Sequence, residues 1–183
     1  TDEGTLRGVA AVLGTMTFVD RFFEDAPEGI CFRNGFVHLM RRGRKYNVKL
    51  VPHSPNNRQC HVLDADYDPE AFPTLTDACF RKWWPGADQD DCVRVAFEVA
   101  GIALLGKGTT MNQGVMLTGE GNNGKSTYSD LIQGMMPATA VVSIPPQEMN
   151  NEYRRNDLCG KLLNAVSEVS TREVVSSAAL KAV

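Results

Sequence analysis

Hydrophobic and polar residues alternate along this chain with a period that changes several times, and each change predicts a different element. Residues 6–23 carry apolar side chains in a broadly helical pattern. The segment Pro27-Glu-Gly29 breaks this pattern before the next apolar run. Two short apolar runs, 30–32 and 36–39, then flank Asn34-Gly35. This dipeptide tolerates the positive φ angles of a tight type I′ turn, so the pattern predicts a helix followed by a β-hairpin. Further strands are predicted at 48–51 and 60–63.

Two amphipathic helices are predicted next. The first begins near Pro73, a residue suited to a first helical turn, and the second begins at about Asp90, where acidic side chains favour the helix dipole. Their apolar faces are predicted to be Leu75, Cys79 and Trp83 on the first helix and Val93, Phe97, Ala100 and Leu104 on the second. A flexible connector at 106–110 follows. We therefore expect two domains, 1–106 and 107–183.

The second of these domains alternates apolar runs with polar helical stretches. The apolar runs at 114–118, 139–144 and 161–168 predict three strands with helices between them. This order is typical of an α/β protein with a parallel sheet, which normally has about five strands. We expect an α/β core cut short after about three strands, with a helical pattern at 174–183 that has no stop signal. The first domain is expected to be a mixed α+β lead-in domain that ends in helices.

A glycine-rich loop connects the first of these predicted strands to the helix after it. Its sequence, Gly119-Glu-Gly-Asn-Asn-Gly-Lys-Ser-Thr127, fits the pattern G-x-x-x-x-G-K-[ST] of phosphate-binding loops. The glycines allow successive backbone N–H groups to point inward, and the following helix adds the positive end of its dipole. An accidental glycine-rich turn is the alternative, and the order of strand, loop and helix argues against it.

Each fixed position of this loop has a chemical task. Lys125 would reach the β- and γ-phosphates of ATP, and the Ser126 hydroxyl would bind Mg²⁺. The sequence therefore predicts a site for ATP and Mg²⁺. The candidate binding residues are Gly119, Gly121, Asn122, Asn123, Gly124, Lys125, Ser126 and Thr127.

A second candidate for catalysis and metal binding is Glu168, at the end of the predicted strand 161–168. An acid there would face the metal across the top of the sheet and would hold a Mg²⁺-bound water or polarise the attacking one. The alternative is a solvent-exposed glutamate at a strand end. Two features weaken the catalytic interpretation: Asn164 interrupts the apolar run, and the glutamate is not one of a pair.

Composition and charge narrow the class of protein. The chain has 183 residues, of which 43% are hydrophobic, and a formal net charge of -3. A surface that is basic all round is therefore excluded, and nucleic-acid contacts are expected only at local basic patches or in an assembly. The five cysteines form an odd set without a C-x-x-C pair, which indicates a reducing cytosol rather than a disulfide framework. No apolar run has the length of a membrane span.

Two further features allow two interpretations each. The basic segment Arg41-Arg-Gly-Arg-Lys45 could contact phosphates, although a solvated turn between strands is favoured. Trp83 and Trp84 could stack on bases, although packing in a hydrophobic core is favoured for one of them, at the end of an amphipathic helix.

The chain resembles the superfamily 3 helicase domain of phage and plasmid primase-helicases, which is related to the poxvirus nucleoside triphosphatase that also carries a primase. The resemblance covers nearly the whole chain, and Asn123 is the most telling variant within the loop. It rests on Phe32-Arg-Asn-Gly-Phe-Val-His-Leu39, Tyr67-Asp-Pro-Glu-Ala71, the loop Gly119–Thr127, Leu158-Cys-Gly-Lys-Leu-Leu-Asn-Ala-Val-Ser-Glu168 and Ala179-Leu-Lys181.

The resemblance implies that 1–106 is the lead-in domain of that family and that the rest begins an AAA-like P-loop ATPase core of a hexameric ring. Lys125, Ser126 and Glu168 would be its phosphate, metal and Walker-B residues. The DNA-gripping hairpin, sensor residue and arginine finger of the family would lie beyond Val183. An arginine finger contributes about 10³ to 10⁵ in rate, so hydrolysis by these residues alone is expected to be close to background.

The expected function is thus the ATP-binding part of a phage or plasmid replicative DNA helicase in a bacterial cytoplasm. It would couple Mg-ATP hydrolysis to movement along single-stranded or forked DNA, as a homo-hexamer beside a primase domain. Two alternatives remain open. One is a P-loop kinase, although no acceptor pocket is marked in the sequence, and the other is a nucleotide-dependent ring-assembly module without useful hydrolysis.

Overall fold

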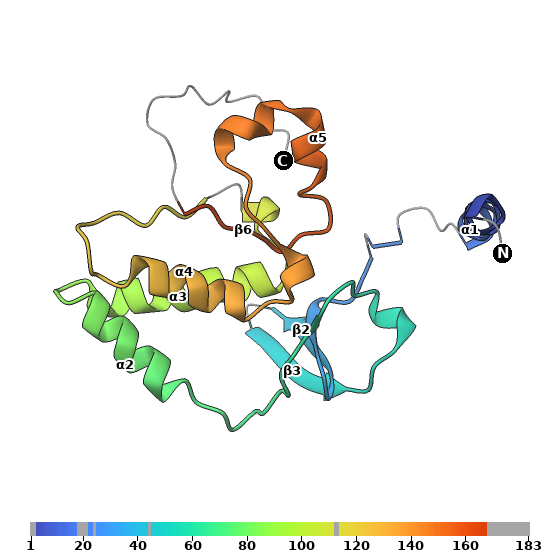
Figure 1. Cartoon of the computed structure of the whole chain (residues 1–183). Coiled ribbons are helices and arrows are strands. Elements are labelled where there is room, and N and C mark those ends of the chain that lie inside the picture. Colours follow the sequence, from blue (N-terminus) through green and yellow to red (C-terminus); the bar gives the residue numbers. More distant parts are fainter. Residues whose placement is uncertain (1–2, 18–21, 24, 44, 112–113, 168–183) are drawn as a thin grey trace.

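The computed structural model describes residues 3–17, 22–23, 25–43, 45–111 and 114–167, and they form a mixed α/β protein (Figure 1). Its helices are α1 (Glu3–Thr17), α2 (Thr74–Trp83), α3 (Gln89–Leu104), α4 (Lys125–Gly134) and α5 (Glu152–Asn156). Its strands are β1 (Gly29–Phe32), β2 (Gly35–Arg42), β3 (Lys45–Val51), β4 (Val62–Leu63), β5 (Val141–Val142) and β6 (Leu163–Asn164). Short 3-10 helices occupy Pro55–Asn57, Thr109–Met111, Ala138–Ala140 and Pro146–Asn150.

The larger sheet has four strands in the order β3-β2-β1-β4, antiparallel except between β1 and β4. The predicted β-hairpin is confirmed, but its turn lies one residue earlier than the Asn-Gly dipeptide indicated. Phe32 pairs with Gly35, so the two residues between them form the turn. The Asn34 side chain pairs instead with the backbone of Tyr67, donating to its carbonyl and accepting from its N–H, both at 2.9 Å.

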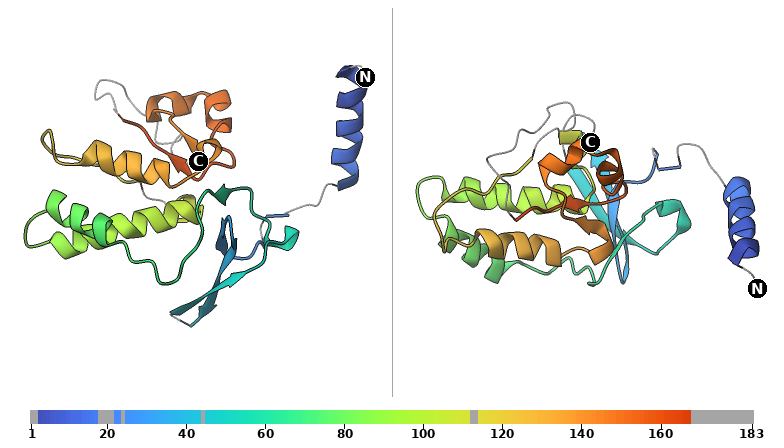
Figure 2. Two further views of the ribbon diagram at one scale, coloured as in Figure 1. Left: turned by 60° about the horizontal axis from the view of Figure 1, so that its bottom comes forward. Right: turned by 45° about the horizontal axis from the view of Figure 1, so that its top comes forward.

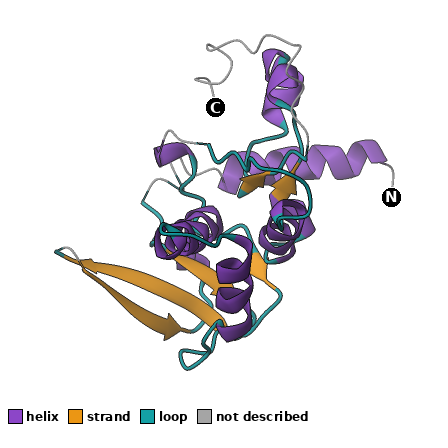
Figure 3. Ribbon diagram, turned by 90° about the vertical axis from the view of Figure 1, so that its left-hand side faces the viewer, coloured by secondary structure: helices purple, strands orange, loops and turns teal. Residues whose placement is uncertain are grey.

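The next hairpin, β2–β3, is long and projects from the rest of the molecule (Figure 3). Its pairing runs over seven residue pairs, from Phe36 opposite Val51 at the base to Arg42 opposite Lys45 at the tip. The base is anchored because Phe36 and Val37 are buried, whereas six of the seven residues of β3 are exposed. The hairpin therefore has an anchored base and a solvated arm.

The main hydrophobic core lies between α2, α3 and α4, and α4 runs alongside α3 (Figure 2). The ring of Phe80 is at its centre. We call Phe80 and the four rings whose centroids lie 5.1 to 5.6 Å from it, Trp83, Trp84, Phe97 and Tyr128, the aromatic cluster. The interpretation that packing is favoured over base stacking for one tryptophan is confirmed, and both Trp83 and Trp84 are in fact partly buried against this core.

The predicted apolar faces of the two helices agree with the structure except at one residue. Val93 and Ala100 are buried on α3, and Phe97 and Leu104 are partly buried. Leu75 was expected on the buried face of α2, but it is 79% exposed. It lies in the first turn of α2, whereas the aromatic cluster forms at the other end of that helix. The same core includes residues on both sides of position 106, and the expected boundary there stays a prediction.

The smaller sheet consists of β5 and β6, which are parallel, as the sequence predicts for the second half of the chain. The strand predicted at 114–118 is absent, so that prediction is wrong. These residues have no regular structure, and Val115 and Met116 are 59% and 77% exposed. A strand requires a neighbour that pairs with its N–H and C=O groups, and no described residue provides one. The helix predicted at 174–183 lies outside the described residues.

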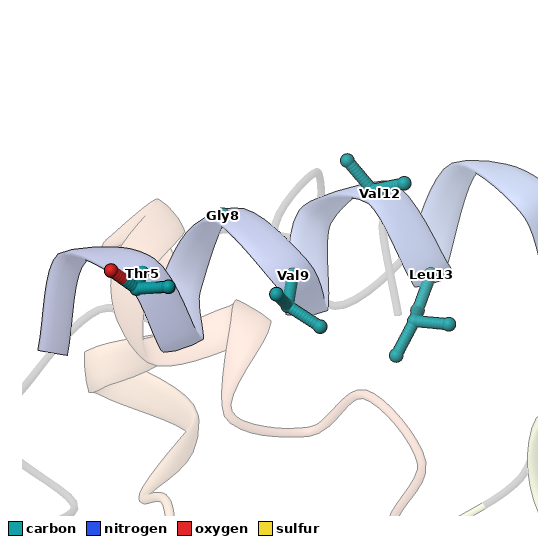
Figure 4. A pocket seen from close by; sticks show the side chains of 5 residues that line it. All are labelled: Thr5, Gly8, Val9, Val12 and Leu13. Carbon is teal, nitrogen blue, oxygen red and sulfur yellow. The ribbon is translucent and has the colours of Figure 1, made fainter. Parts of the chain in front are cut away.

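Helix α1 stands apart from the core in both orientations of Figure 2. Its apolar side chains Leu6, Val9, Val12 and Leu13 are 52 to 59% exposed. A shallow hollow follows this helix, and Figure 4 shows its lining by Thr5, Gly8, Val9, Val12 and Leu13. Among the described residues, no helix combines the length and apolar character that a membrane crossing requires.

Candidate phosphate-binding loop

The glycine-rich loop, Gly119–Thr127, ends in the first turn of α4, which begins at Lys125, as the sequence predicts. Three of its residues have positive φ angles: Gly119 at 141°, Asn122 at 60° and Gly124 at 82°. Glycine adopts such angles without steric cost, and asparagine is the side chain that tolerates the left-handed region best. Turns that mix right- and left-handed residues form concave backbone surfaces that bind anions.

Gly124 is fixed in place by the aromatic cluster. A Cβ atom at this position would lie 2.5 Å from Cδ2 of Trp83 and 2.6 Å from its Cγ. The indole ring therefore supports the loop directly, and only glycine fits between the ring and the turn. Gly121, in contrast, has no atom within 4 Å of where its Cβ would be. Both glycines are candidate binding residues, but only Gly124 is a fixed position of the loop pattern, and of the two only Gly124 is confined by packing.

The backbone of the loop offers a continuous set of hydrogen-bond donors. The nine successive N–H groups from Gly119 to Thr127 donate to no atom of the residues that the structure describes. The first bonded N–H of α4 is that of Tyr128, which donates to the Gly124 carbonyl at 2.8 Å. No side chain caps this helix. Free N–H groups and the positive end of the helix dipole thus coincide, which is the environment that binds phosphate.

The ammonium group of Lys125 lies against this loop. Its Nζ donates to the carbonyl oxygens of Gly119 at 2.9 Å and Glu120 at 2.7 Å, and to Oδ1 of Asn123 at 2.7 Å. A lysine ammonium has three N–H donors, so all three are engaged. Phosphate oxygens that bind here must take over at least one of these contacts.

Asn123 has a positioning role in this arrangement. Its Oδ1 accepts from Lys125, while its Nδ2 lies 2.4 Å from where a Cβ on Gly119 would be. The Asn123 carboxamide thus connects the start of the loop to the lysine near its end. The sequence resemblance had singled out this asparagine, and the geometry gives it a physical task.

Helix α4 is held on α3 by a buried tyrosine. Tyr128 is 4% exposed, and its hydroxyl donates to the Ala96 carbonyl at 2.9 Å. Burial raises the pKa of this tyrosine above its usual value of 10.0, because the phenolate would lose its hydration. On the opposite side of the same turn, Ser126 and Thr127 are exposed. The helix therefore buries its anchor and presents its hydroxyl groups at the mouth of the loop.

The structure brings the eight candidate binding residues together in one turn, but Glu168 lies outside the described residues. Its role in catalysis and metal binding stays a prediction. The asparagine that weakened this interpretation has a structural explanation. Asn164 accepts from the Ile144 N–H at 2.8 Å and donates to the Ile144 carbonyl at 2.9 Å, so its side chain takes the place of the next backbone pair between β5 and β6.

Two residues of this site were not found by sequence reasoning. The contact of Trp83 with Gly124 and the hydrogen bond of Tyr128 to Ala96 join segments that are distant in the sequence. The helical spacing of Tyr128 indicated that it is buried, but no sequence signal indicated its partner. Trp83 was interpreted as a core residue, without any indication that it supports the loop.

Comparison with known proteins gives one match. Residues 117–183 match a family described as "Family of unknown function (DUF5906)". No curated protein and no solved structure matches the chain. The matched segment covers less than half of the chain and includes the glycine-rich loop and α4, so the candidate site lies within the part that is similar to this family.

Proposed function

We propose that the glycine-rich loop binds the phosphates of ATP and that this chain is the nucleotide-binding part of a replicative DNA helicase of the phage or plasmid primase-helicase type. The observation that carries the first half of this proposal is the set of nine N–H groups from Gly119 to Thr127, at the start of α4, that have no acceptor among the described residues. Most of the loop is exposed, so these N–H groups face solvent and remain available to an acceptor in one concave turn. An anion with several oxygen atoms suits it.

In this proposal each residue of the loop has one task. The free N–H groups donate to the phosphate oxygens. The Lys125 ammonium group, which donates to the carbonyls of Gly119 and Glu120, donates instead to the β- and γ-phosphates when nucleotide binds. Asn123 keeps the lysine over the loop. The exposed Ser126 hydroxyl is a suitable ligand for Mg²⁺, which neutralises phosphate charge when bound. Glu168 is assigned to the attacking water.

The helicase half of the proposal rests on the sequence resemblance, which extends over nearly the whole chain. It implies a homo-hexameric ring that moves along single-stranded or forked DNA beside a primase domain, in the cytoplasm of a bacterial host. Lys125 and Glu168 are the proposed catalytic residues. The family described above overlaps the same loop, and its description leaves the function open.

Nucleotide binding is tested by the thermal midpoint with and without Mg-ADP. Ligand at about 100 times its Kd stabilises by about 2.7 kcal/mol, which raises the midpoint of a domain of this size by roughly 5 to 10 °C. We expect this rise in the wild-type protein and in Lys82→Ala, which removes an exposed lysine from α2. Lys125→Ala should lose it. A folded wild-type protein without any rise contradicts the proposal.

The helicase assignment has its own test. Hydrolysis is measured on a protein that includes the arginine finger and the sensor residue that the resemblance implies. Stimulation of ATP hydrolysis by single-stranded DNA supports a helicase. Hydrolysis that is indifferent to DNA contradicts it, even where Mg-ADP binding is established.

A further inference from the structure

Unpaired positive charge is concentrated on the β2–β3 hairpin. Outside it, seven basic side chains form ion pairs with carboxylates: Arg7, Arg33, Arg81, Arg94, Lys107, Arg154 and Arg155. The other four that the structure describes outside the hairpin have no carboxylate partner among the described residues and are spread along the sequence: Arg58, Lys82, Lys125 and Lys161. On the hairpin, Arg41, Arg42, Lys45 and Lys49 have no carboxylate partner within the described part of the chain. In a chain of net charge -3, this local excess cannot be a consequence of overall composition.

The register of the hairpin gathers three of these cations, Arg42, Lys45 and Lys49, on one face. Arg42 lies opposite Lys45, and Lys49 lies opposite His38 four residues further along. Directly opposed residues and residues two apart share a face, so these side chains form two basic layers about 14 Å apart on one side of the ribbon. Like charges directly opposite each other destabilise a strand pair. The arrangement is therefore unfavourable by itself and becomes favourable when an anion lies across it.

The other face of the same arm is apolar and partly aromatic. Tyr46, Val48 and Leu50 are 51%, 50% and 39% exposed along β3. Tyr46 lies opposite Arg41, whose Nε donates to the Gly43 carbonyl at 3.1 Å. Arg41 is the basic residue on this face, so an aromatic ring and a cation lie side by side here, on the side of the ribbon opposite to Arg42, Lys45 and Lys49.

We propose that the β2–β3 hairpin binds the phosphate backbone of single-stranded DNA through Arg42, Lys45 and Lys49, which share one face of the ribbon. The hairpin projects into solvent, which leaves room for a strand to pass along it (Figure 3). This inference adds a DNA contact to the proposed function, at a position separate from the glycine-rich loop. Binding at the hairpin does not require ATP.

The test is titration of a fluorescein-labelled oligothymidylate into the protein at several salt concentrations, read by anisotropy. The variant Arg42→Ala with Lys45→Ala removes two phosphate contacts. For single strands each contact contributes about 0.7 to the slope of log K against log salt, so the slope should fall by about 1.4. At about 0.1 M salt this corresponds to roughly 25-fold weaker binding.

The matched control removes two positive charges elsewhere. Arg7→Ala with Arg94→Ala changes the net charge by the same amount, and both side chains belong to exposed ion pairs outside the hairpin. This control should keep the slope and affinity of the wild-type protein. The hairpin variant should keep a thermal midpoint at least as high as that of the wild-type protein, because it relieves the repulsion between Arg42 and Lys45.

Failure of this inference is distinguishable from failure of the ATP proposal. The hairpin variant should retain the Mg-ADP shift of the thermal midpoint, and Lys125→Ala should retain DNA binding. The inference is overturned if the wild-type protein does not bind the oligonucleotide at low salt, or if the hairpin variant binds it with unchanged slope. It is also overturned if a duplex binds more tightly, or if the substitutions change only self-association in sedimentation, which would assign the exposed β3 edge to a second copy of the chain.

Discussion

The glycine-rich loop and the β2–β3 hairpin both present positive charge, but they organise it in opposite ways. In the loop, all three donors of Lys125 are engaged, and the turn rests on the indole ring of Trp83. On the hairpin, Arg42 and Lys45 face each other without an acidic partner among the described residues. The loop is shaped by packing, so substitutions that add side-chain volume should affect its stability and binding most. The hairpin should be affected most by substitutions that change charge.

The strongest test of this difference is Gly124→Ala. The substitution forces an alanine to adopt a φ of 82° and places its Cβ 2.5 Å from the Trp83 ring. A left-handed alanine and an overpacked contact together cost about 2 to 4 kcal/mol, or roughly 5 to 15 °C in the thermal midpoint. We expect the Mg-ADP shift to be lost as well, while oligonucleotide binding to the folded protein is kept.

The matched control is Gly121→Ala in the same loop. Its φ is not positive and its Cβ would meet no atom within 4 Å, so the free energy of unfolding should change by less than about 0.5 kcal/mol. Urea unfolding of both variants makes the comparison. Equal losses in the two variants would show that the contact with Trp83 does not shape the loop.

A smaller effect is expected from Tyr128→Phe, which removes the hydrogen bond between α4 and α3. The Ala96 carbonyl loses a donor, which costs about 1 kcal/mol of unfolding free energy at neutral pH. Burial raises the pKa of Tyr128 in the folded protein above 10.0, so wild-type stability is retained below that pH and declines as the pH rises above it.

Phenylalanine has no such ionisation, and the remaining titrating groups are common to both proteins. The difference in unfolding free energy between the wild-type protein and the Tyr128→Phe variant should therefore shrink above pH 10. Urea titrations at neutral and alkaline pH measure it. A difference that stays constant would show that the phenol ionises as easily in the folded protein as in the unfolded chain.

The smallest expected change is at the hairpin. Arg42→Glu places an acid opposite Lys45, and a cross-strand pair of opposite charge contributes about 0.2 to 1 kcal/mol. This variant should be slightly more stable than the wild-type protein and should bind single-stranded DNA more weakly. The substitution on the other strand, Lys45→Glu, should act in the same way. The double variant places two acids opposite each other and should lose the gain in stability. Thermal midpoints of the four proteins complete the cycle.

Predictions from the sequence succeeded where the signal is local. The helix that follows the glycine-rich loop and the apolar face of α3 follow from residue types within a few positions of one another. These features depend on turn geometry and helical spacing, which neighbouring residues determine. The same reasoning named the eight candidate residues of the loop, and their role in binding stays a prediction.

Predictions failed where an element needs a distant partner. The run 114–118 has the composition of a buried strand, yet no described neighbour pairs with it. Leu75 has the spacing of a core residue, yet it lies in the first turn of α2, at the end away from the aromatic cluster. The support of Gly124 by Trp83 is likewise a contact between two helices' ends that no periodicity encodes.

The aromatic cluster has an optical consequence. The sequence contains two tryptophans, and both Trp83 and Trp84 belong to this cluster, with Trp83 in contact with the glycine-rich loop. All tryptophan emission of the chain therefore originates beside the candidate phosphate site, and none originates on the hairpin. The protein carries its own fluorescent reporter of the loop, without an added dye.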